Sequence, residues 1–246
     1  MKSLSSSDIK FIKSLSQKKF RDETGLFVVE GEKMVTEALE SGFKVESVFY
    51  RDEIGEELMK RISQLSNPSP ALAVLHQADR CKCHITKGLY LALDSIRDPG
   101  NLGTIIRIAD WFGVNAVIAS EDTVELYNPK VVQATMGAIF RVPIYYCKLS
   151  ETLSDIRENG GKVLGTFLDG EDLYADKELV CADGPTVIVI GNESNGISGE
   201  IGKLVTDRVF IPPYPIGART SESLNAAVAT AIATAEIRRR ERLKTK

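Results

Sequence analysis

The chain has 246 residues, of which 43% are hydrophobic and 26% are charged, a composition that supports a folded core and excludes a wholly disordered protein. A formal net charge of −3 argues against a protein that coats nucleic acid over its whole surface. No apolar run reaches the roughly 20 residues of a membrane span, and no signal sequence opens the chain, so we expect a cytoplasmic protein.

The first part of the chain alternates helical and strand patterns, which is typical of a small α/β domain. The expected helices are residues 9–20, 32–41 and 54–65, and the expected strands are residues 26–29, 45–50 and 71–75. We predict that this first domain spans residues 1–78. A polar stretch without apolar periodicity follows and predicts a linker over residues 79–87.

A second α/β pattern fills residues 88–246 and predicts a second domain. Its expected strands are residues 90–93, 116–119, 144–146, 163–167, 186–190 and 208–211, and its helices include 104–112, 129–139 and a long one from about 224. The strand Val187-Ile188-Val189-Ile190 is apolar at every position, as a strand buried on both faces of a parallel sheet is.

Four cysteines without a secretory signal favour reduced thiols over disulfides. Cys81, Cys83 and His84 lie close enough together to suggest metal ligands. No second ligand pair follows at the spacing of structural zinc sites, so an ordinary linker is the favoured interpretation and we expect no metal.

Two runs of basic residues are candidates for phosphate contacts. They are Lys10, Lys13, Lys18, Lys19 and Arg21 near the start of the chain, and Arg238, Arg239, Arg240, Arg242, Lys244 and Lys246 at its end. The alternative is a solvated helix face for the first run and cations that oppose the dipole of a final helix for the second. Taken alone, charge runs favour this second interpretation.

A first polar segment runs from Leu93 to Arg107 and reads as a strand, a Pro/Gly turn and a helix. Asn101 would lie at the start of the helix, where free N–H groups and the helix dipole favour anions. Arg107 would lie on the same helix. Asn101 as a simple cap, and Arg107 as a surface or interface ion-pair partner, are equally good explanations.

A second segment follows the buried strand at Gly191-Asn192-Glu193-Ser194-Asn195-Gly196. Ligands of α/β proteins bind at the carboxyl ends of strands, and Gly191 would let a ligand approach the backbone. A structural turn in which Glu193 caps a helix is an equal alternative.

The third segment begins at Ile211-Pro212 and continues to Ser223-Leu224-Asn225, at the start of a helix rich in small residues. An N-cap explains one of the two polar residues, Ser223 or Asn225, and leaves the other without a structural role.

Together the three segments resemble the SpoU (TrmH-like) family of RNA 2'-O-ribose methyltransferases in the SPOUT superfamily. The family patterns D-P-x-N-x-G-x-x-x-R, G-N-E-x-x-G and I-P…S-L-N are matched by Asp98, Pro99, Asn101, Gly103 and Arg107; by Gly191, Asn192, Glu193 and Gly196; and by Ile211, Pro212, Ser223, Leu224 and Asn225. Residues 27–33 also resemble the small ribosomal-protein-like RNA-binding domain of many members.

The resemblance implies a trefoil-knotted C-terminal methyltransferase domain that binds S-adenosyl-L-methionine (AdoMet) and works as a homodimer. By resemblance, Gly191, Ile211 and Leu224 would contact AdoMet through their backbone, and Thr166 and Gly170 would line the pocket. The chain has neither a P-loop nor a G-x-G-x-x-G fingerprint, which argues against a kinase or a dehydrogenase.

The resemblance also implies catalytic roles. A guanidinium is a reluctant base, so we expect Arg107 to hold a phosphate and orient the ribose 2'-hydroxyl. We expect Asn101, Glu193, Ser223 and Asn225 to hold Arg107 and the ribose in register, and the first basic run to bind rRNA or tRNA. The alternative is a catalytically inactive RNA-binding protein with the same fold; the intact motif residues count against it.

Overall fold

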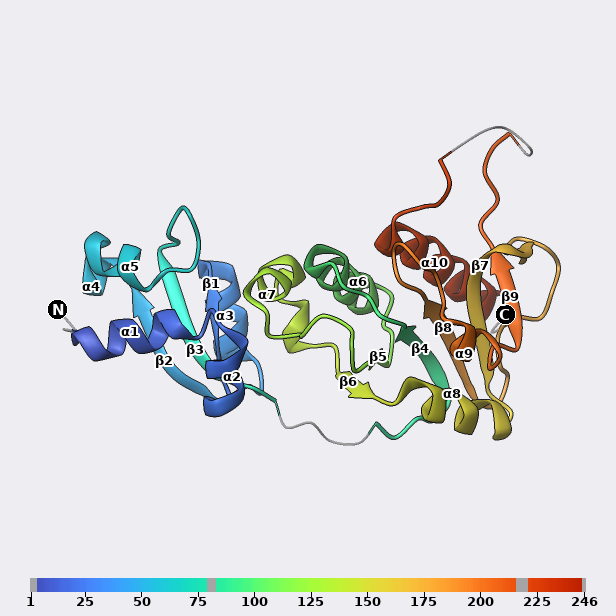
Figure 1. Ribbon diagram of the computed structural model, residues 1–246, viewed down its shortest axis with the longest axis horizontal. Coiled ribbons are helices and arrows are strands. Elements are labelled where there is room, and N and C mark those ends of the chain that lie inside the picture. The colour runs from blue at the N-terminus through green and yellow to red at the C-terminus, as the bar shows by residue number, and fades with distance from the viewer. Residues whose placement is uncertain (1–3, 79–82, 216–220, 245–246) are drawn as a thin grey trace. The chain divides into compact units, whose positions relative to one another are not determined.

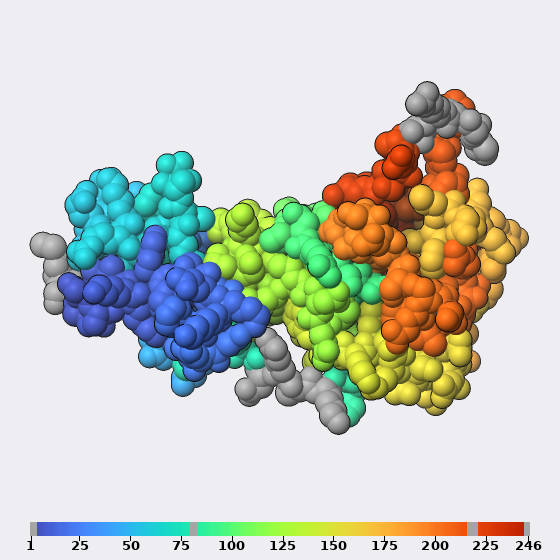
Figure 2. All heavy atoms as spheres, viewed as in Figure 1, coloured from blue at the N-terminus to red at the C-terminus, as the bar shows by residue number. Residues whose placement is uncertain are grey.

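The computed structural model describes residues 4–78, 83–215 and 221–244. Their contacts divide the chain into two compact units (Figures 1 and 2). The first unit combines the described part of Met1–Arg80 with Glu125–Arg141, and the second combines the described part of Cys81–Val124 with Val142–Lys246. None of the described helices is long and apolar enough to cross a membrane.

The first unit is built on a three-stranded antiparallel sheet in the order β1-β3-β2. The strands β1 (Leu26–Glu30), β2 (Val45–Tyr50) and β3 (Ala71–His76) agree with the expected ones. The helices are α1 (Ser6–Ser14), α2 (Lys18–Thr24), α3 (Glu32–Glu40), α4 (Arg51–Ile54) and α5 (Glu56–Ile62).

One helix that we expected to be continuous, over residues 9–20, is broken into two, and the helix expected over residues 54–65 is the shorter α5, preceded by the helical turn α4 that we did not expect. Gln17 has an extended backbone (φ −98°, ψ 134°) and separates α1 from α2. Gly55 has a φ of 87°, outside the helical region, and separates α4 from α5. The apolar spacing is helical on both sides of Gln17, and periodicity therefore could not reveal that break.

Residues 125–141 (yellow-green in Figure 2) belong to the first unit although they lie in the middle of the chain. Arg21 is buried, at 2% exposure, and its guanidinium donates to both carboxylate oxygens of Glu125 (3.1 and 2.6 Å) and to the Leu15 carbonyl (2.9 Å). The rings of Phe27 and Tyr127 lie 4.5 Å apart. A buried, fully hydrogen-bonded pair and an aromatic contact thus attach this segment to the first unit.

The segment forms α7 (Pro129–Thr135) and the short 3-10 helix η1 (Ala138–Phe140). The expected helix over 129–139 ends early because Met136 and Gly137 have positive φ values of 51° and 95°.

The second unit contains a six-stranded sheet in which every pairing is parallel, in the order β6-β5-β4-β8-β7-β9 (Figure 1). The strands are β4 (Gly88–Leu93), β5 (Ala116–Ser120), β6 (Ile144–Cys147), β7 (Lys162–Asp172), β8 (Pro185–Ile190) and β9 (Asp207–Phe210). The parallel α/β fold expected from the sequence is therefore confirmed.

Helices cover this sheet. The helices are α6 (Pro99–Trp111), α8 (Leu149–Glu158), α9 (Gly199–Gly202) and α10 (Ala226–Lys244). Leu149, Leu153 and Ile156 of α8 pack in one buried cluster with Tyr90 and Ala92 of β4. Helices α6 and α10 contact each other, and α10 also contacts β8.

The strand order reverses between β4 and β8. The chain builds outward from β4 through β5 to β6, and the later strands β8, β7 and β9 lie on the other side of β4. Ligands of open α/β sheets bind at such a switch point, outside the carboxyl ends of the strands. The first two polar segments follow these two central strands directly.

Candidate active site

The turn after β8 is held by its own backbone and by Asn192. Asn192 and Gly196 exchange two backbone hydrogen bonds of 2.9 Å, and the Asn192 Oδ1 atom accepts from the N–H groups of Ser194 (3.0 Å) and Asn195 (3.1 Å). A Cβ on Gly191 would lie 2.2 Å from the Gly196 carbonyl carbon. The turn itself therefore requires glycine at position 191, whether or not a ligand approaches there.

Two hydrogen bonds fasten this turn to the end of β4. The Asn192 Nδ2 atom donates to the Ser95 carbonyl (2.7 Å), and the Ser198 N–H donates to the buried Asp94 carboxylate (2.7 Å). Ser95 has a φ of 60°, a conformation that non-glycine residues rarely adopt. Its N–H donates to the Ser120 hydroxyl (2.9 Å), so both sides of the strained residue are fixed.

The N-cap of α6 is Asp98, whose carboxylate accepts from the Asn101 N–H at 2.7 Å, with Pro99 as the first helical residue. Asn101 is therefore the third residue of the helix and not its cap. Its side chain is left for other contacts. Its Nδ2 atom donates to Glu193 Oε1 (2.9 Å), and its Oδ1 atom accepts from Asn225 Nδ2 (2.8 Å).

Asn225 has two roles at once. Its Oδ1 atom accepts from the N–H groups of Ala227 (2.9 Å) and Val228 (3.2 Å), which makes Asn225 the N-cap of α10. Its Nδ2 atom reaches Asn101. Asn101 thus links one residue from each of the three polar segments, over sequence separations of 92 and 124 residues.

The other two expected catalytic residues do not join this network directly. Arg107 lies on α6 and Ser223 precedes α10; both are exposed. Neither side chain forms a hydrogen bond or ion pair within the described part of the chain. Their functional groups are therefore open to a ligand.

The residues expected to contact the cofactor lie at the ends of three neighbouring parallel strands. Thr166 is in β7 and donates to the Val189 carbonyl of β8 (3.1 Å), Gly191 follows β8, and Ile211 follows β9. Thr166 and Glu171 both pair with Val209, so residues 167–170 bulge out of the sheet edge. Leu224 is 46% exposed and precedes the cap of α10.

Sequence reasoning missed three residues near this site. An open pocket at the switch point is lined in part by Arg97, together with Asp98, Pro99 and Asn192–Asn195. Hydrogen bonds from the Ser95 and Ser120 hydroxyl groups, with a further one from Arg97, lower the pKa of Asp122. Asp94 directly follows an apolar strand, and that position was the available signal for it.

The first basic run is only partly available for RNA. Arg21 is buried and paired with Glu125, so the expectation that it contacts RNA is wrong. The Lys13 ammonium donates to the Ser63 carbonyl. Lys10, Lys18 and Lys19 are exposed, the last two beside Asp22 and Glu23 on the next helical turn.

The second basic run is largely used within the unit. Arg238 donates to the carbonyl groups of Phe112 (2.8 Å) and Gly113 (2.5 Å), and Arg239 pairs with Glu236 (2.7 Å). Lys246 lies outside the described residues, as does Cys81 of the cysteine cluster. Among the residues that are described, no three His, Cys, Asp or Glu side chains gather as metal ligands would.

Comparisons with known proteins identify relatives of both units. The family model of the SpoU rRNA methylase family matches residues 88–235, and that of an MRM3-like substrate binding domain matches residues 6–61. The chain is 29% identical to a 23S rRNA (guanosine(2553)-2'-O)-methyltransferase of Bacillus subtilis, over 94% of this chain and 95% of that protein.

Solved structures of RNA methyltransferases are also similar to this chain. A TrmH-family protein from Porphyromonas gingivalis superimposes with a TM-score of 0.87 at 38% identity, over 97% of this chain and 100% of that one. An AdoMet-bound rRNA methyltransferase from Sinorhizobium meliloti gives a TM-score of 0.85 at 32% identity, over 98% and 97% of the two chains.

Proposed function

Because the chain belongs to the SpoU rRNA methylase family, we propose that it transfers a methyl group from AdoMet to a ribose 2'-hydroxyl of ribosomal RNA. The observation that carries this proposal is the network in which Asn101 joins Glu193 and Asn225. Three segments that the sequence keeps far apart meet in one polar cluster at the switch point of the sheet.

The ends of β7, β8 and β9 suit AdoMet. The half-buried Thr166 and Ile211 and the exposed Leu224 offer polar backbone groups beside apolar side chains, which a ligand with a charged amino acid part and a flat base requires. AdoMet supplies an electrophilic methyl group when it is bound. The chain's own residues have to place a hydroxyl group beside it.

Arg107 performs this placement in our proposal. Its planar guanidinium, which has no partner among the described residues, holds an RNA phosphate with two donors and orients the neighbouring 2'-hydroxyl. A guanidinium is a poor base, so Arg107 does not take the hydroxyl proton, which passes to a phosphate oxygen or to water. Asn101, Glu193, Ser223 and Asn225 keep the ribose in register.

The finer parts of the proposal are a homodimer, a knotted second unit and a ribosomal target. Trp111 of α6 is 85% exposed and Val228 of α10 is 48% exposed, on helices that contact each other, and a second copy would cover these apolar side chains. The names of the relatives support ribosomal RNA, and the substrate-binding match supports an RNA role for the first unit.

The test is methyl transfer from AdoMet with a labelled methyl group to total RNA from cells that lack this protein. We expect label in ribosomal RNA at a bond that resists alkaline hydrolysis, because a 2'-O-methyl group blocks cleavage. Label in transfer RNA alone would contradict the ribosomal target. AdoMet and RNA binding without any transfer would favour the catalytically inactive alternative.

A further inference from the structure

A four-residue bulge at residues 167–170 divides β7. It separates Thr166, at the proposed cofactor pocket, from Glu171 and Asp172 at the end of the strand. Gly170 ends the bulge, and a Cβ at this position would lie 2.6 Å from the Val209 carbonyl carbon of β9. The Arg208 guanidinium lies 3.5 Å from the centroid of the Phe167 ring and pairs with Asp169. The bulge therefore packs closely against β9. Its position depends on the contacts that hold the residues following β7.

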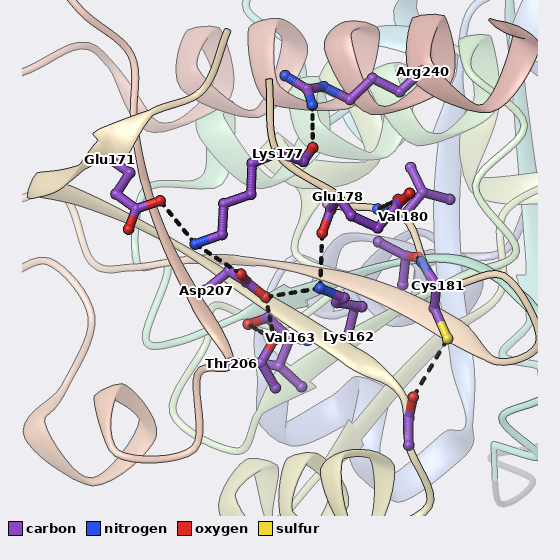
Figure 3. Close-up of polar contacts among 12 residues, drawn as sticks. Lys162, Val163, Glu171, Lys177, Glu178, Val180, Cys181, Thr206, Asp207 and Arg240 are labelled. Carbon is purple, nitrogen blue, oxygen red and sulfur yellow. Dashed lines mark hydrogen bonds and ion pairs between the residues drawn. The ribbon is translucent and has the colours of Figure 1, made fainter. Parts of the chain in front are cut away.

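The chain after β7 is held by Lys177. Its ammonium bridges Glu171 (2.8 Å), at the end of the bulged strand, and the buried Asp207 (3.1 Å), at the start of β9 (Figure 3). Asp207 also accepts from the Thr206 hydroxyl (2.8 Å) and pairs with Lys162 (3.5 Å). One cationic side chain thus ties the loop to both β7 and β9.

Arg240 holds the same loop from the opposite side. Its guanidinium donates to the backbone carbonyl groups of Leu173 (2.7 Å), Ala175 (2.9 Å) and Lys177 (2.5 Å), and its Nε atom donates to Glu236 (2.7 Å). Only 12% of the Arg240 side chain is exposed. All three acceptors in the loop are backbone carbonyl groups. Arg240 therefore fixes the path of the main chain and not the position of one side chain.

Arg240 and the proposed site lie on one helix. Helix α10 starts immediately after Asn225, and Arg240 follows fourteen residues after Ala226, about 21 Å along the axis at 1.5 Å per residue. A continuous helix of this length transmits an axial displacement from one end to the other. Its first end carries Leu224 and Asn225, and its other end is fastened to the loop that continues the bulge.

We propose that Arg240 is a positioning residue for AdoMet binding, because it sets the place of α10, and hence of Leu224, relative to Thr166 and the bulge at residues 167–170. This inference rests on the proposed function. Without the guanidinium, the three carbonyl groups lose their common partner and α10 is free to shift along its axis. The distance between Leu224 on one side of the cofactor pocket and the bulge of β7 on the other is then no longer fixed.

The experiment compares Arg240→Met, Arg240→Lys and Arg239→Ala by calorimetric titration with AdoMet, at a temperature where circular dichroism shows all proteins folded. Arg239 is the matched control because it is on the same helix and pairs with the same Glu236, but forms no hydrogen bond or ion pair with the described residues of the loop after β7. We expect the AdoMet dissociation constant to rise at least about tenfold in Arg240→Met. Arg240→Lys should recover part of this loss, and Arg239→Ala should match the unchanged protein.

The Michaelis constants separate positioning from general destabilisation. In Arg240→Met the constant for AdoMet should rise, while the constant for RNA stays within about twofold. A lower melting temperature with unchanged AdoMet affinity in Arg240→Met would overturn the inference. If the unchanged protein itself does not bind AdoMet, the proposed function fails instead.

Discussion

At the scale of single residues, the site depends on which atoms are already occupied. Asp98 caps α6, and this frees the Asn101 side chain to bond Glu193 and Asn225. Arg107 has no partner among the described residues and is therefore available to substrate. Placement of reacting groups matters because a misplacement of about 1 Å can cost on the order of a hundredfold in rate.

Arg107→Lys should fold and bind AdoMet almost normally, yet lose at least about a hundredfold in single-turnover methyl transfer. The charge remains, but an ammonium cannot hold a phosphate and a neighbouring hydroxyl with a planar fork. Melting temperature and oligomeric state, measured in parallel, control for misfolding. Near-normal turnover would show that Arg107 serves only as a surface charge.

Asn101→Asp should reduce methyl transfer by at least about tenfold, because it removes the donor to Glu193 and places two carboxylates together. The Asn225 Nδ2 atom still has an oxygen of residue 101 to donate to in this variant. Adding Glu193→Gln restores a donor and an acceptor with the direction of the bond reversed. The double variant should therefore recover activity; a double variant no better than Asn101→Asp would contradict a role for this bond.

At the scale of elements, the edge of the sheet formed by β7 and β9 decides the shape of the proposed cofactor pocket. Gly170→Ala places a methyl group against the backbone of Val209, so the two strands must separate. We expect a loss of about 1–3 kcal/mol in the free energy of unfolding and a weaker AdoMet affinity. Denaturant titration and calorimetry measure the two quantities.

Gly199→Ala is the control for this change. Gly199 opens α9, and an added Cβ would meet no atom within 4 Å. We expect its stability to stay within about 0.5 kcal/mol of the unchanged protein. Equal losses in both glycine variants would mean that contact with Val209 is not the cause.

The Asp207 network predicts how stability depends on pH. Burial acts to raise the pKa of Asp207, but hydrogen bonds from Thr206 and Lys177 and the charges of both lysines outweigh burial and lower it. A carboxyl group whose pKa is lower in the folded state stabilises the fold above its unfolded pKa of about 3.8. That contribution disappears as the pH falls through the folded value.

Asp207→Asn should therefore cost about 1–3 kcal/mol in the free energy of unfolding at pH 7, because it removes a charged acceptor from a buried network. The difference between variant and unchanged protein should shrink steadily as the pH falls below about 4. Denaturant titrations across this range measure it. A difference that is the same at pH 7 and pH 3 would show that the charge of Asp207 is not what stabilises the edge.

At the scale of the whole molecule, the first unit is not a simple N-terminal segment. Residues 125–141 complete it, and Arg21 and Phe27 pack against Glu125 and Tyr127. Deleting residues 1–78 would expose this packing, so the RNA role of the unit has to be tested by substitution at its surface. The domain boundaries that we predicted at residues 78 and 88 remain predictions, because the first unit also contains residues 125–141.

The variant with Lys10, Lys18 and Lys19 all replaced by glutamine should bind ribosomal RNA more weakly and AdoMet unchanged. Each phosphate contact contributes about 0.7–0.9 to the slope of log affinity against log salt concentration, so the slope should fall by about 2–3 if all three lysines contact phosphates. Binding measured at several salt concentrations gives the slope. An unchanged slope would assign RNA binding to other residues.

The sequence by itself determined the positions of the strands, the parallel fold class and the three polar segments, although β7 continues to Asp172, beyond the expected end at residue 167. Strands such as Val187–Ile190 are apolar throughout, a property that can be recognised from neighbours in the chain. The start of α6 was expected at Asn101, whereas Asp98 caps the helix and Pro99 is its first residue. The motif spacing was enough to indicate the family. What was missed locally, such as the break at Gln17, lay inside a pattern that stays helical on both sides.

Only the tertiary structure decided which polar groups meet. The order β4-β8-β7-β9 brings Asn101 to Glu193 across 92 residues and places Arg240 over the loop after β7. In the first unit, the inclusion of residues 125–141 brings Glu125 to the buried Arg21 across 104 residues. The sequence around a charged residue does not show whether its partner is solvent, an RNA phosphate or a buried carboxylate. Strand order and burial select among these partners, and neither is encoded in the spacing of nearby residues.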